Sequence, residues 1–103
     1  MKLNVTLLNF LKYEDKETHQ PKIRIGYINQ DTNYISNKDK FKGYAELSVF
    51  LDDDKAWDLL DVDMCGRSAE LEFTSTPNPR NPLKNITKLV AIRAKGHADI
   101  SFV

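Results

Sequence analysis

The sequence contains a single cysteine, Cys65, and only two histidines, His19 and His97, among 103 residues. One thiol cannot form a disulfide within the chain, so we expect a protein of a reducing compartment. No apolar run reaches the length of a membrane span, and no basic-then-apolar signal segment is visible. These absences predict a cytoplasmic protein that does not enter a membrane.

The scarcity of reactive side chains also argues against catalysis. The two histidines and the cysteine do not have the spacing of zinc or iron ligands, and the sequence shows neither a glycine-rich phosphate loop nor a nucleophile elbow. The acidic segment Asp52–Asp63 lacks the glycine and the glutamate of a calcium-binding EF-hand loop. We therefore expect no enzyme, no metal, no cofactor and no small-molecule substrate.

Neither sign of charge is in excess, since 15 basic and 15 acidic residues give a net charge of zero. The charges are nevertheless segregated along the chain. Residues 1–44 carry eight basic and five acidic side chains, residues 45–65 carry one and seven, and residues 66–103 carry six and three. A single domain of residues 1–103, which is what this length predicts, could turn this pattern into one basic and one acidic face.

Alternation of apolar and polar residues predicts five strands. They are residues 2–13, a second strand that Pro21 opens, residues 41–51, a fourth strand marked by Ala69, Leu71 and Phe73, and residues 86–92. In the first strand the doubled Leu7-Leu8 predicts a β-bulge that lets a long strand bend. In the third strand the expected core face is Ala45, Leu47, Val49 and Leu51, with Tyr44, Glu46, Ser48 and Phe50 opposite.

The hydrophobic period changes after the third strand. In LDDDKAWDLLDV the aspartates suit a helix N-terminus and the apolar residues recur at helical spacing, which predicts a short helix at Asp53–Leu60 covering one end of the sheet. The proline-rich residues 74–85 predict an exposed loop, because proline cannot donate a hydrogen bond to a strand ladder. The last residues, Asp99–Val103, are expected to add an edge strand or a docking tail.

Three strands, a short helix and two further strands match the OB fold, a small five-stranded Greek-key barrel. Gly26 and Gly43, in the second and third strands, favour a barrel because a small barrel has to bend sharply. The alternative is an open antiparallel sheet that carries one helix.

Basic residues interleaved with aromatic rings form the remaining pattern. In the strand HQPKIRIGYIN, alternation puts Lys22, Arg24 and Gly26 on the face opposite the isoleucines. Single-stranded nucleic acid needs cations for its phosphates and flat rings for its unstacked bases. The candidates for these contacts are Tyr13, Lys16, Lys22, Arg24, Tyr27, Tyr34, Lys38, Lys40, Phe41, Lys42, Tyr44, Arg80, Lys84 and Lys88. The alternative is that Tyr27 and Phe41 belong partly to the core and that the lysines only make the hairpins soluble.

The run FKGYAELSVFLDDDKAW, followed by GRSAELEFTSTPNPRNPLKNITKLVAIRAK, resembles the single-stranded-DNA-binding, helix-destabilising proteins of filamentous phages. The resemblance covers the pattern of most of residues 2–95. It implies an OB-fold dimer that coats single strands cooperatively. In that scheme Lys16, Lys22 and Arg24 would contact phosphates, Tyr27, Tyr34 and Phe41 would stack on bases, and Arg80 would lie on a loop directed at the dimer axis. The longer chain, the helix and the zero net charge depart from the family pattern.

Together these observations predict a non-catalytic protein that binds single-stranded DNA or RNA with little sequence preference, as an accessory to phage or plasmid DNA replication or recombination. A homodimer is expected from the resemblance and from the stiff loop at Pro77–Pro82. The alternative hypothesis is a small protein-binding module or phage-type inhibitor, whose acidic region Asp52–Asp63 engages a basic partner.

Overall fold

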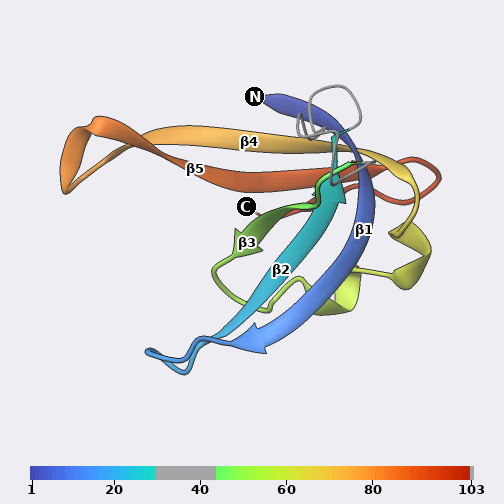
Figure 1. Cartoon of the computed structure of the whole chain (residues 1–103), viewed down its shortest axis with the longest axis horizontal. Coiled ribbons are helices and arrows are strands. Elements are labelled where there is room, and N and C mark those ends of the chain that lie inside the picture. The colour runs from blue at the N-terminus through green and yellow to red at the C-terminus, as the bar shows by residue number, and fades with distance from the viewer. Residues whose placement is uncertain (30–43, 103) are drawn as a thin grey trace, which may run out of the picture.

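The computed structural model describes residues 1–29 and 44–102 and shows a mainly β protein (Figure 1). Six strands form one antiparallel sheet in the order β3-β2-β1-β4-β5-β6. They are β1 (Lys2–Glu14), β2 (Pro21–Ile28), β3 (Leu47–Leu51), β4 (Ser68–Asn78), β5 (Asn81–Ala94) and β6 (Ile100–Ser101). The all-β prediction is confirmed, but the strands number six because the C-terminal residues add an edge strand to β5.

Strand β1 belongs to both halves of the sheet and curves from one to the other (Figure 1). Residues 2–6 pair with β4, whereas residues 6–14 pair with β2. The register shifts between Leu7 and Asn9, so Leu8 is the extra residue of the predicted bulge. At this bend the Gly66 N–H donates to the Leu7 carbonyl oxygen at 2.7 Å, which fastens the segment before β4 to β1.

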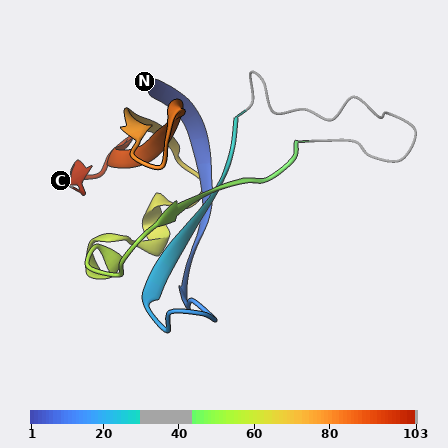
Figure 2. The ribbon, with the colours of Figure 1, turned by 90° about the vertical axis from the view of Figure 1, so that its left-hand side faces the viewer.

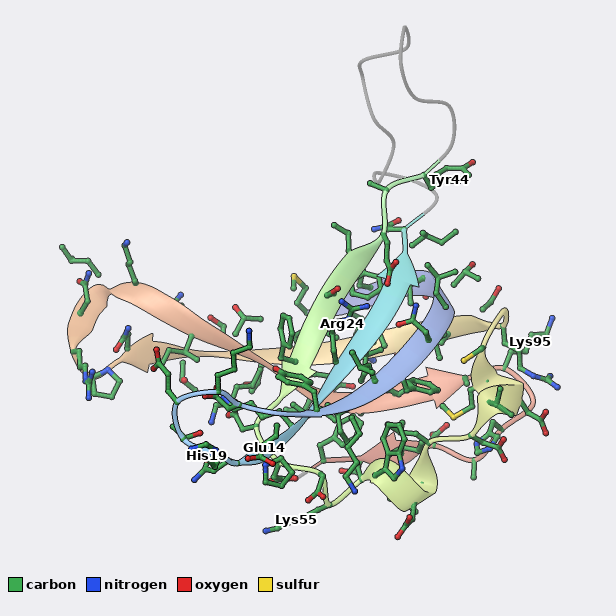
Figure 3. All side chains as sticks on the ribbon, turned by 60° about the horizontal axis from the view of Figure 1, so that its bottom comes forward. Glu14, His19, Arg24, Tyr44, Lys55 and Lys95 are labelled. Carbon is green, nitrogen blue, oxygen red and sulfur yellow. The ribbon has the colours of Figure 1, made fainter. Side chains whose placement is uncertain are left out.

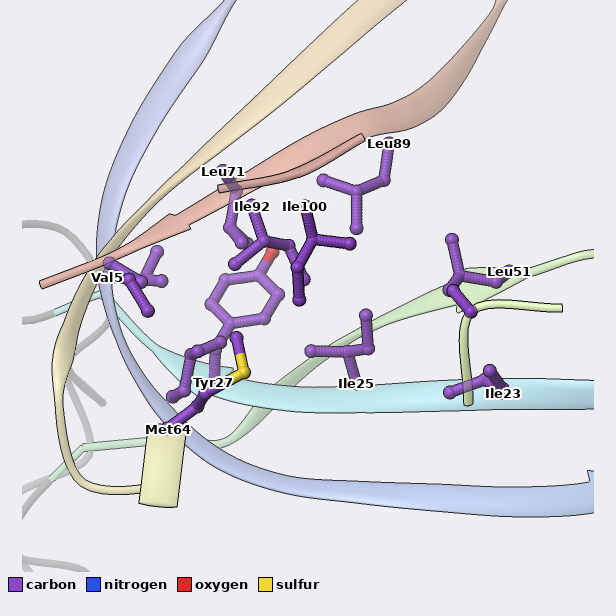
Figure 4. Packing of buried hydrophobic residues seen from close by; sticks show 14 of the residues in the cluster. Val5, Ile23, Ile25, Tyr27, Leu51, Met64, Leu71, Leu89, Ile92 and Ile100 are labelled. Atoms are coloured by element: carbon purple, nitrogen blue, oxygen red, sulfur yellow. The ribbon is translucent and has the colours of Figure 1, made fainter. Parts of the chain in front are cut away.

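The hydrophobic core lies inside the curve of the sheet and draws on all six strands (Figure 4). Ile23 and Ile25 of β2 are fully buried together with Leu71 of β4 and Ile92 of β5. Burying each such side chain contributes about 1.5–3 kcal/mol. The alternation predicted for HQPKIRIGYIN is therefore confirmed on its apolar side.

The connection between β3 and β4 differs from the predicted helix. Two single-turn 3-10 helices, η1 (Trp57–Leu59) and η2 (Val62–Met64), replace it. Leu60 and Asp61 between them have extended backbone angles, which break a continuous helix. The segment still covers one end of the sheet, because Met64 is fully buried and Ala56 is nearly so.

The aspartates of this connection also act differently from the prediction. The N-cap residue of η1 is Ala56, which offers no side-chain cap, whereas the Asp61 side chain accepts the Asp63 N–H and caps η2. Asp54 instead forms an ion pair with Lys12 of β1, at 3.3 Å between Nζ and Oδ2. The Asp54 carboxylate thus links this connection to β1.

The predicted closed barrel is not formed. In the part of the chain that the structure describes, β3 and β6 are the two edges of an open sheet, seen from the side in Figure 2. Cα atoms of β3 and β5 approach within 8 Å. To close the barrel, β3 would have to pair with the free edge of β5. Ile100 and Ser101 of β6 pair with that edge instead. The five-stranded barrel of the prediction is therefore corrected to a curved, six-stranded sheet.

The proline-rich loop is also corrected, because most of residues 74–85 lie in strands. Pro77 pairs with Asn85, and Asn78 pairs with Asn81 after a register shift, so β4 and β5 form a long hairpin arm that projects from the sheet (Figure 1). On the outer edge of β4, pairing with β1 ends at Glu72, and Phe73 exchanges hydrogen bonds with Met1. Beyond Phe73 no residue of β4 pairs with β1 in the described residues, so no ladder there requires an N–H donor. Proline is tolerated on such an edge.

Strand β3 is shorter than predicted, and its core face is incomplete. Leu51 is buried and Val49 is partly buried, but Leu47 is 38% exposed. Leu47 is exposed because it is the first residue of β3, a five-residue edge strand that has a neighbouring strand on one side only.

This difference predicts unequal costs for two identical substitutions. We expect Leu71→Ala to lower the free energy of unfolding by about 2–5 kcal/mol, because it empties a fully buried site. Leu47→Ala is expected to cost about 1 kcal/mol or less, because its side chain already contacts water. Urea denaturation of both variants measures the difference, and equal losses would contradict this description of the core.

Candidate nucleic-acid interface

The face of β1, β2 and β3 that points away from the core is built by strand register. Leu11 of β1 pairs with Arg24 of β2, which pairs with Phe50 of β3. One row further along, Tyr13 pairs with Lys22. These five residues, Leu11, Tyr13, Lys22, Arg24 and Phe50, are called the outer face below. Since side chains alternate along a strand, each lies opposite a neighbour that packs toward the core.

Two aromatic rings meet on the outer face. The ring centroids of Tyr13 and Phe50 lie 6.3 Å apart with an interplanar angle of 80°, an edge-to-face arrangement. Phe50 is 55% exposed, and Leu11, in the same row on the other side of Arg24, is 47% exposed. Large exposed apolar side chains gathered in one place are typical of a binding surface. The outer face therefore offers accessible ring surface next to a guanidinium group.

Both cations of the outer face already have carboxylate partners. Arg24 Nη2 lies 3.7 Å from Glu46 Oε1, and Lys22 Nζ lies 3.4 Å from Asp15 Oδ2. Fully exposed ion pairs contribute about 0–1 kcal/mol because water screens them. The pairs here are partly exposed, at 25% and 29% for Lys22 and Asp15 and at 38% and 42% for Arg24 and Glu46, so water still reaches them. A phosphate group can therefore replace either carboxylate. Figure 3 shows Arg24 on the ribbon of β2.

The turn that joins β1 to β2 is ordered around Asp15. Its Oδ1 accepts the backbone N–H groups of Glu17 at 2.8 Å and of Thr18 at 3.1 Å. These two hydrogen bonds, with a smaller contribution from Lys22, hold the pKa of the Asp15 carboxyl below its ordinary value. Lys16 is exposed in this turn, so the hairpin presents one further cation beyond the end of the strands.

Among the sequence-predicted candidates that the structure describes, Tyr27 is the one whose side chain is buried in the core. It is 8% exposed and packs in the core near Met64 (Figure 4). Burial raises the pKa of its phenol. The alternative reading, in which Tyr27 is a core residue, is correct, because Tyr27 shares the apolar face of β2 with Ile23 and Ile25.

Most of the remaining candidates lie away from the outer face or outside the described residues. Arg80, at the tip of the β4–β5 arm, and Lys84 in β5 are exposed on the arm. Lys88 of β5 is also exposed, but it lines one pocket together with Phe50 and so lies close to the outer face. Tyr44 is 49% exposed and projects beyond the end of the strands, away from Arg24 (Figure 3). The candidates that lie outside the described residues are Tyr34, Lys38, Lys40, Phe41 and Lys42.

Phe50 and Leu11 belong to the interface but were not among the sequence-predicted residues. The signal for Phe50 was present in FKGYAELSVFL, where alternation places it on the face opposite Val49 and Leu51. Leu11 could not be found in this way. Its face depends on the bulge at Leu8, which reverses the alternation of β1 from there on.

A second cluster of charged side chains lies on β4 and β5, where Arg93 is paired with two glutamates. Arg93 Nη1 lies 2.7 Å from Glu72 Oε1 and 3.0 Å from Glu70 Oε1 across β4 and β5. The hydrogen bond from Arg93 lowers the pKa of Glu72, and the two carboxylates raise that of Arg93. In residues 1–29 and 44–102, no group of three histidine, cysteine or acidic side chains could hold a metal ion.

Within the same described ranges, no helix is long and apolar enough to cross a membrane. Comparison with protein-family models, with curated proteins and with solved structures finds no match for this chain. The candidate interface is therefore defined by its own geometry.

The Asp15 turn leads to a prediction on pH. A carboxyl whose pKa is lowered by folding stabilises the protein above its unfolded pKa, near 3.8, and this contribution is lost as the pH falls through the lower folded pKa. Asp15→Asn keeps an acceptor oxygen but removes the charge. We expect the variant to unfold at lower urea than the wild type at neutral pH, and the two midpoints to converge as the pH falls below 3.8 and the Asp15 carboxyl of the folded chain takes up its proton. A difference that does not change with pH would contradict this role of the carboxylate.

Proposed function

We propose that this chain binds single-stranded nucleic acid, DNA or RNA, with little sequence preference and without catalysis, through the outer face of β1, β2 and β3. The observation that carries the proposal is the edge-to-face pair of the partly buried Tyr13 and the exposed Phe50, in which Phe50 pairs with Arg24 across the strands. Exposed rings accept unstacked bases, and neighbouring cations follow the phosphates.

The arrangement favours a single strand over a duplex. In a duplex the base faces are stacked on one another and cannot reach a protein ring, whereas a single strand can turn its bases onto Tyr13 and Phe50. Stacking depends on the flat face that every base has, so it gives affinity with little dependence on sequence. The zero net charge fits a binder whose cations are local rather than spread over the whole surface.

The strand order supports an OB-like arrangement for the sheet, in a partly open form. In the order β3-β2-β1-β4-β5, β1 is shared by both halves, and β3 and β5 approach within 8 Å at their Cα atoms. Opening a five-stranded Greek-key barrel between its third and fifth strands produces this order. OB folds bind single strands on the face of their second and third strands, which corresponds here to β2 and β3.

The biological setting proposed for this activity is an accessory role in phage or plasmid DNA replication or recombination, in a cytoplasmic compartment. It rests on the resemblance of the sequence pattern to the filamentous-phage binders and on the presence of one cysteine.

A second candidate function, the protein-binding module, is favoured by one specific observation. Leu59 of η1 is 54% exposed and Val62 of η2 is 78% exposed, and Asp58, Asp61 and Asp63 flank them with exposed side chains. Apolar residues surrounded by carboxylates suit a partner surface that is both apolar and basic. Leu59 lines one pocket together with Phe50, whereas Val62, Asp61 and Asp63 do not, so substitutions at Val62, Asp61 and Asp63 separate the two functions.

The ring pair predicts a distinct effect on affinity. We expect Phe50→Ala to raise the dissociation constant for oligo-dT by about five- to a hundredfold, since one stacked base is worth roughly 1–3 kcal/mol. The slope of log K against log salt should stay the same, because no phosphate contact is lost. Fluorescence anisotropy over several salt concentrations measures both quantities.

Two further variants make the comparison specific. Phe50→Tyr keeps the ring and should bind like the wild type. Lys22→Gln removes a cation and should instead flatten the salt slope by about 0.7. Unchanged affinity in Phe50→Ala, or a flattened slope in that variant, would show that Phe50 does not stack on bases.

We also propose a homodimer formed through the β4–β5 arm. Leu83 on the arm is 95% exposed, and residues 74–76 of β4 are exposed as well, so the arm has apolar and strand-edge surface that a second copy could cover. Light scattering at micromolar concentration should give about twice the chain mass of 11.9 kDa, and Leu83→Asp should reduce it to one chain. A mass of one chain for the wild type at all concentrations would rule out the dimer.

A further inference from the structure

Gly26 of β2 lies at a point of close approach on the same side of the sheet as the outer face. A Cβ atom built on Gly26 would overlap Glu46 Oε1 and would lie 2.6 Å from Asn9 Oδ1. The space directly above the β2 backbone is therefore occupied by one carboxylate and one amide. Glycine leaves room for these two side-chain ends, and a larger residue would displace the Glu46 carboxylate and the Asn9 amide.

Two donors converge on the carboxylate that fills this space. Asn9 Nδ2 donates to Glu46 Oε1 at 3.2 Å, and Arg24 Nη2 lies 3.7 Å from the same oxygen. Two polar atoms beside it, Arg24 Nε and Asn9 Oδ1, are buried and have no hydrogen-bond partner among the described residues. The Glu46 carboxylate thus uses only part of the donor capacity around it, since one guanidinium N–H stays unpaired.

The geometry points to an anion cradle formed by Asn9, Gly26 and Arg24, which takes a phosphate group of the bound strand and which Glu46 occupies in the free chain. This inference rests on the proposed function and names the position of one phosphate on that interface. Glu46 contacts these donors through one of its two carboxylate oxygens, whereas a phosphate group has more oxygens and can also accept from Arg24 Nε. Arginine binds such groups through two N–H donors at once.

The cradle lies on the same face of the sheet as the aromatic rings. Arg24 pairs with Phe50 in the strand register, and Gly26 lies two residues further along β2 on the same face. A phosphate held at Gly26 would therefore lie two residues along β2 from the row of Phe50, the ring on which the neighbouring base would stack, and four residues from the row of Tyr13. The nucleic acid would contact both with adjacent parts of one nucleotide chain.

Glu46 is placed so that it can leave the cradle. It precedes the first residue of β3, Leu47, and so lies outside the strand ladder. Its contacts to Asn9 and Arg24 are made by the side chain, so rotation about side-chain bonds releases them without breaking a strand pair. The contact to Arg24 is an exposed ion pair and is weak. Glu46 is therefore an internal competitor that lowers the affinity for the strand.

The test is the variant Glu46→Gln, which keeps an acceptor oxygen for Asn9 but removes the competing charge. At low salt we expect it to bind fluorescein-labelled oligo-dT about three- to tenfold more tightly than the wild type, and the gain to shrink as salt screens the carboxylate. An oligomer of abasic deoxyribose phosphates should show the same relative gain, because the cradle contacts phosphate and not base. The control Asp63→Asn makes the same change in net charge away from β2 and should stay within about twofold of the wild type.

The outcomes separate the cradle from the proposed function. If the wild type binds oligo-dT and Glu46→Gln binds no better, or no better than Asp63→Asn, the cradle is wrong and the proposed function stands. If neither chain binds oligo-dT at low salt, the proposed function fails. The cradle is then tested by an NMR titration of Glu46→Gln with inorganic phosphate. Saturable shifts of the Asn9 and Gly26 amide signals support the cradle, and the absence of such shifts overturns it.

Discussion

The two-residue period of β2 is the constraint on which the rest of this structure depends. It turns Ile23 and Ile25 into the centre of the core and at the same time turns Lys22 and Arg24 to the opposite face. A shift of one residue would exchange these sets and would bury two cations without partners, at a cost of several kilocalories per mole each. The register that makes the core therefore also places the cations of the candidate interface.

The cations of the interface are neutralised locally in the free chain. Arg24 faces Glu46, and Lys22 faces Asp15, so the outer face has little net charge until a carboxylate is displaced. This pairing gives a physical meaning to the equal numbers of acidic and basic residues. A chain of this kind would rely on ring stacking and on exchange of carboxylate for phosphate rather than on long-range attraction.

Much of the fold could be predicted from alternation, because each buried strand follows a period of two. The bulge at Leu8 was visible as a doubled leucine, and the fourth and fifth strands were visible as Leu71 and Ile92 with their neighbours. The choice between the closed barrel and the open sheet was not fixed by alternation. It depends on whether β6 or β3 pairs with the edge of β5, and the open sheet and an edge strand within Asp99–Val103 had been expected only as alternatives. The hairpin arm was missed because prolines at an unpaired edge look like a loop in sequence.

The candidate site was only partly predictable, because some of its contacts join strands that lie far apart in the sequence. Lys22 and Arg24 follow from the period of one strand, but the meeting of Tyr13 with Phe50 depends on the register between three strands. The contact of Glu46 with Asn9 joins residues 37 positions apart, which no local pattern signals. Tyr27 was misassigned to the interface because its residue type suited stacking, although its position in the alternation placed it in the core.

The most direct test of the central claim is an NMR titration of the wild-type chain with oligo-dT, read at each backbone amide. The account predicts saturable shifts at Leu11, Tyr13, Lys22, Arg24 and Phe50 that are much weaker with a duplex of equal length. The amides of the η1 and η2 segment should not shift. Shifts confined to that segment or to the β4–β5 arm, or no shifts at low salt, would contradict the assignment of the outer face as a nucleic-acid interface.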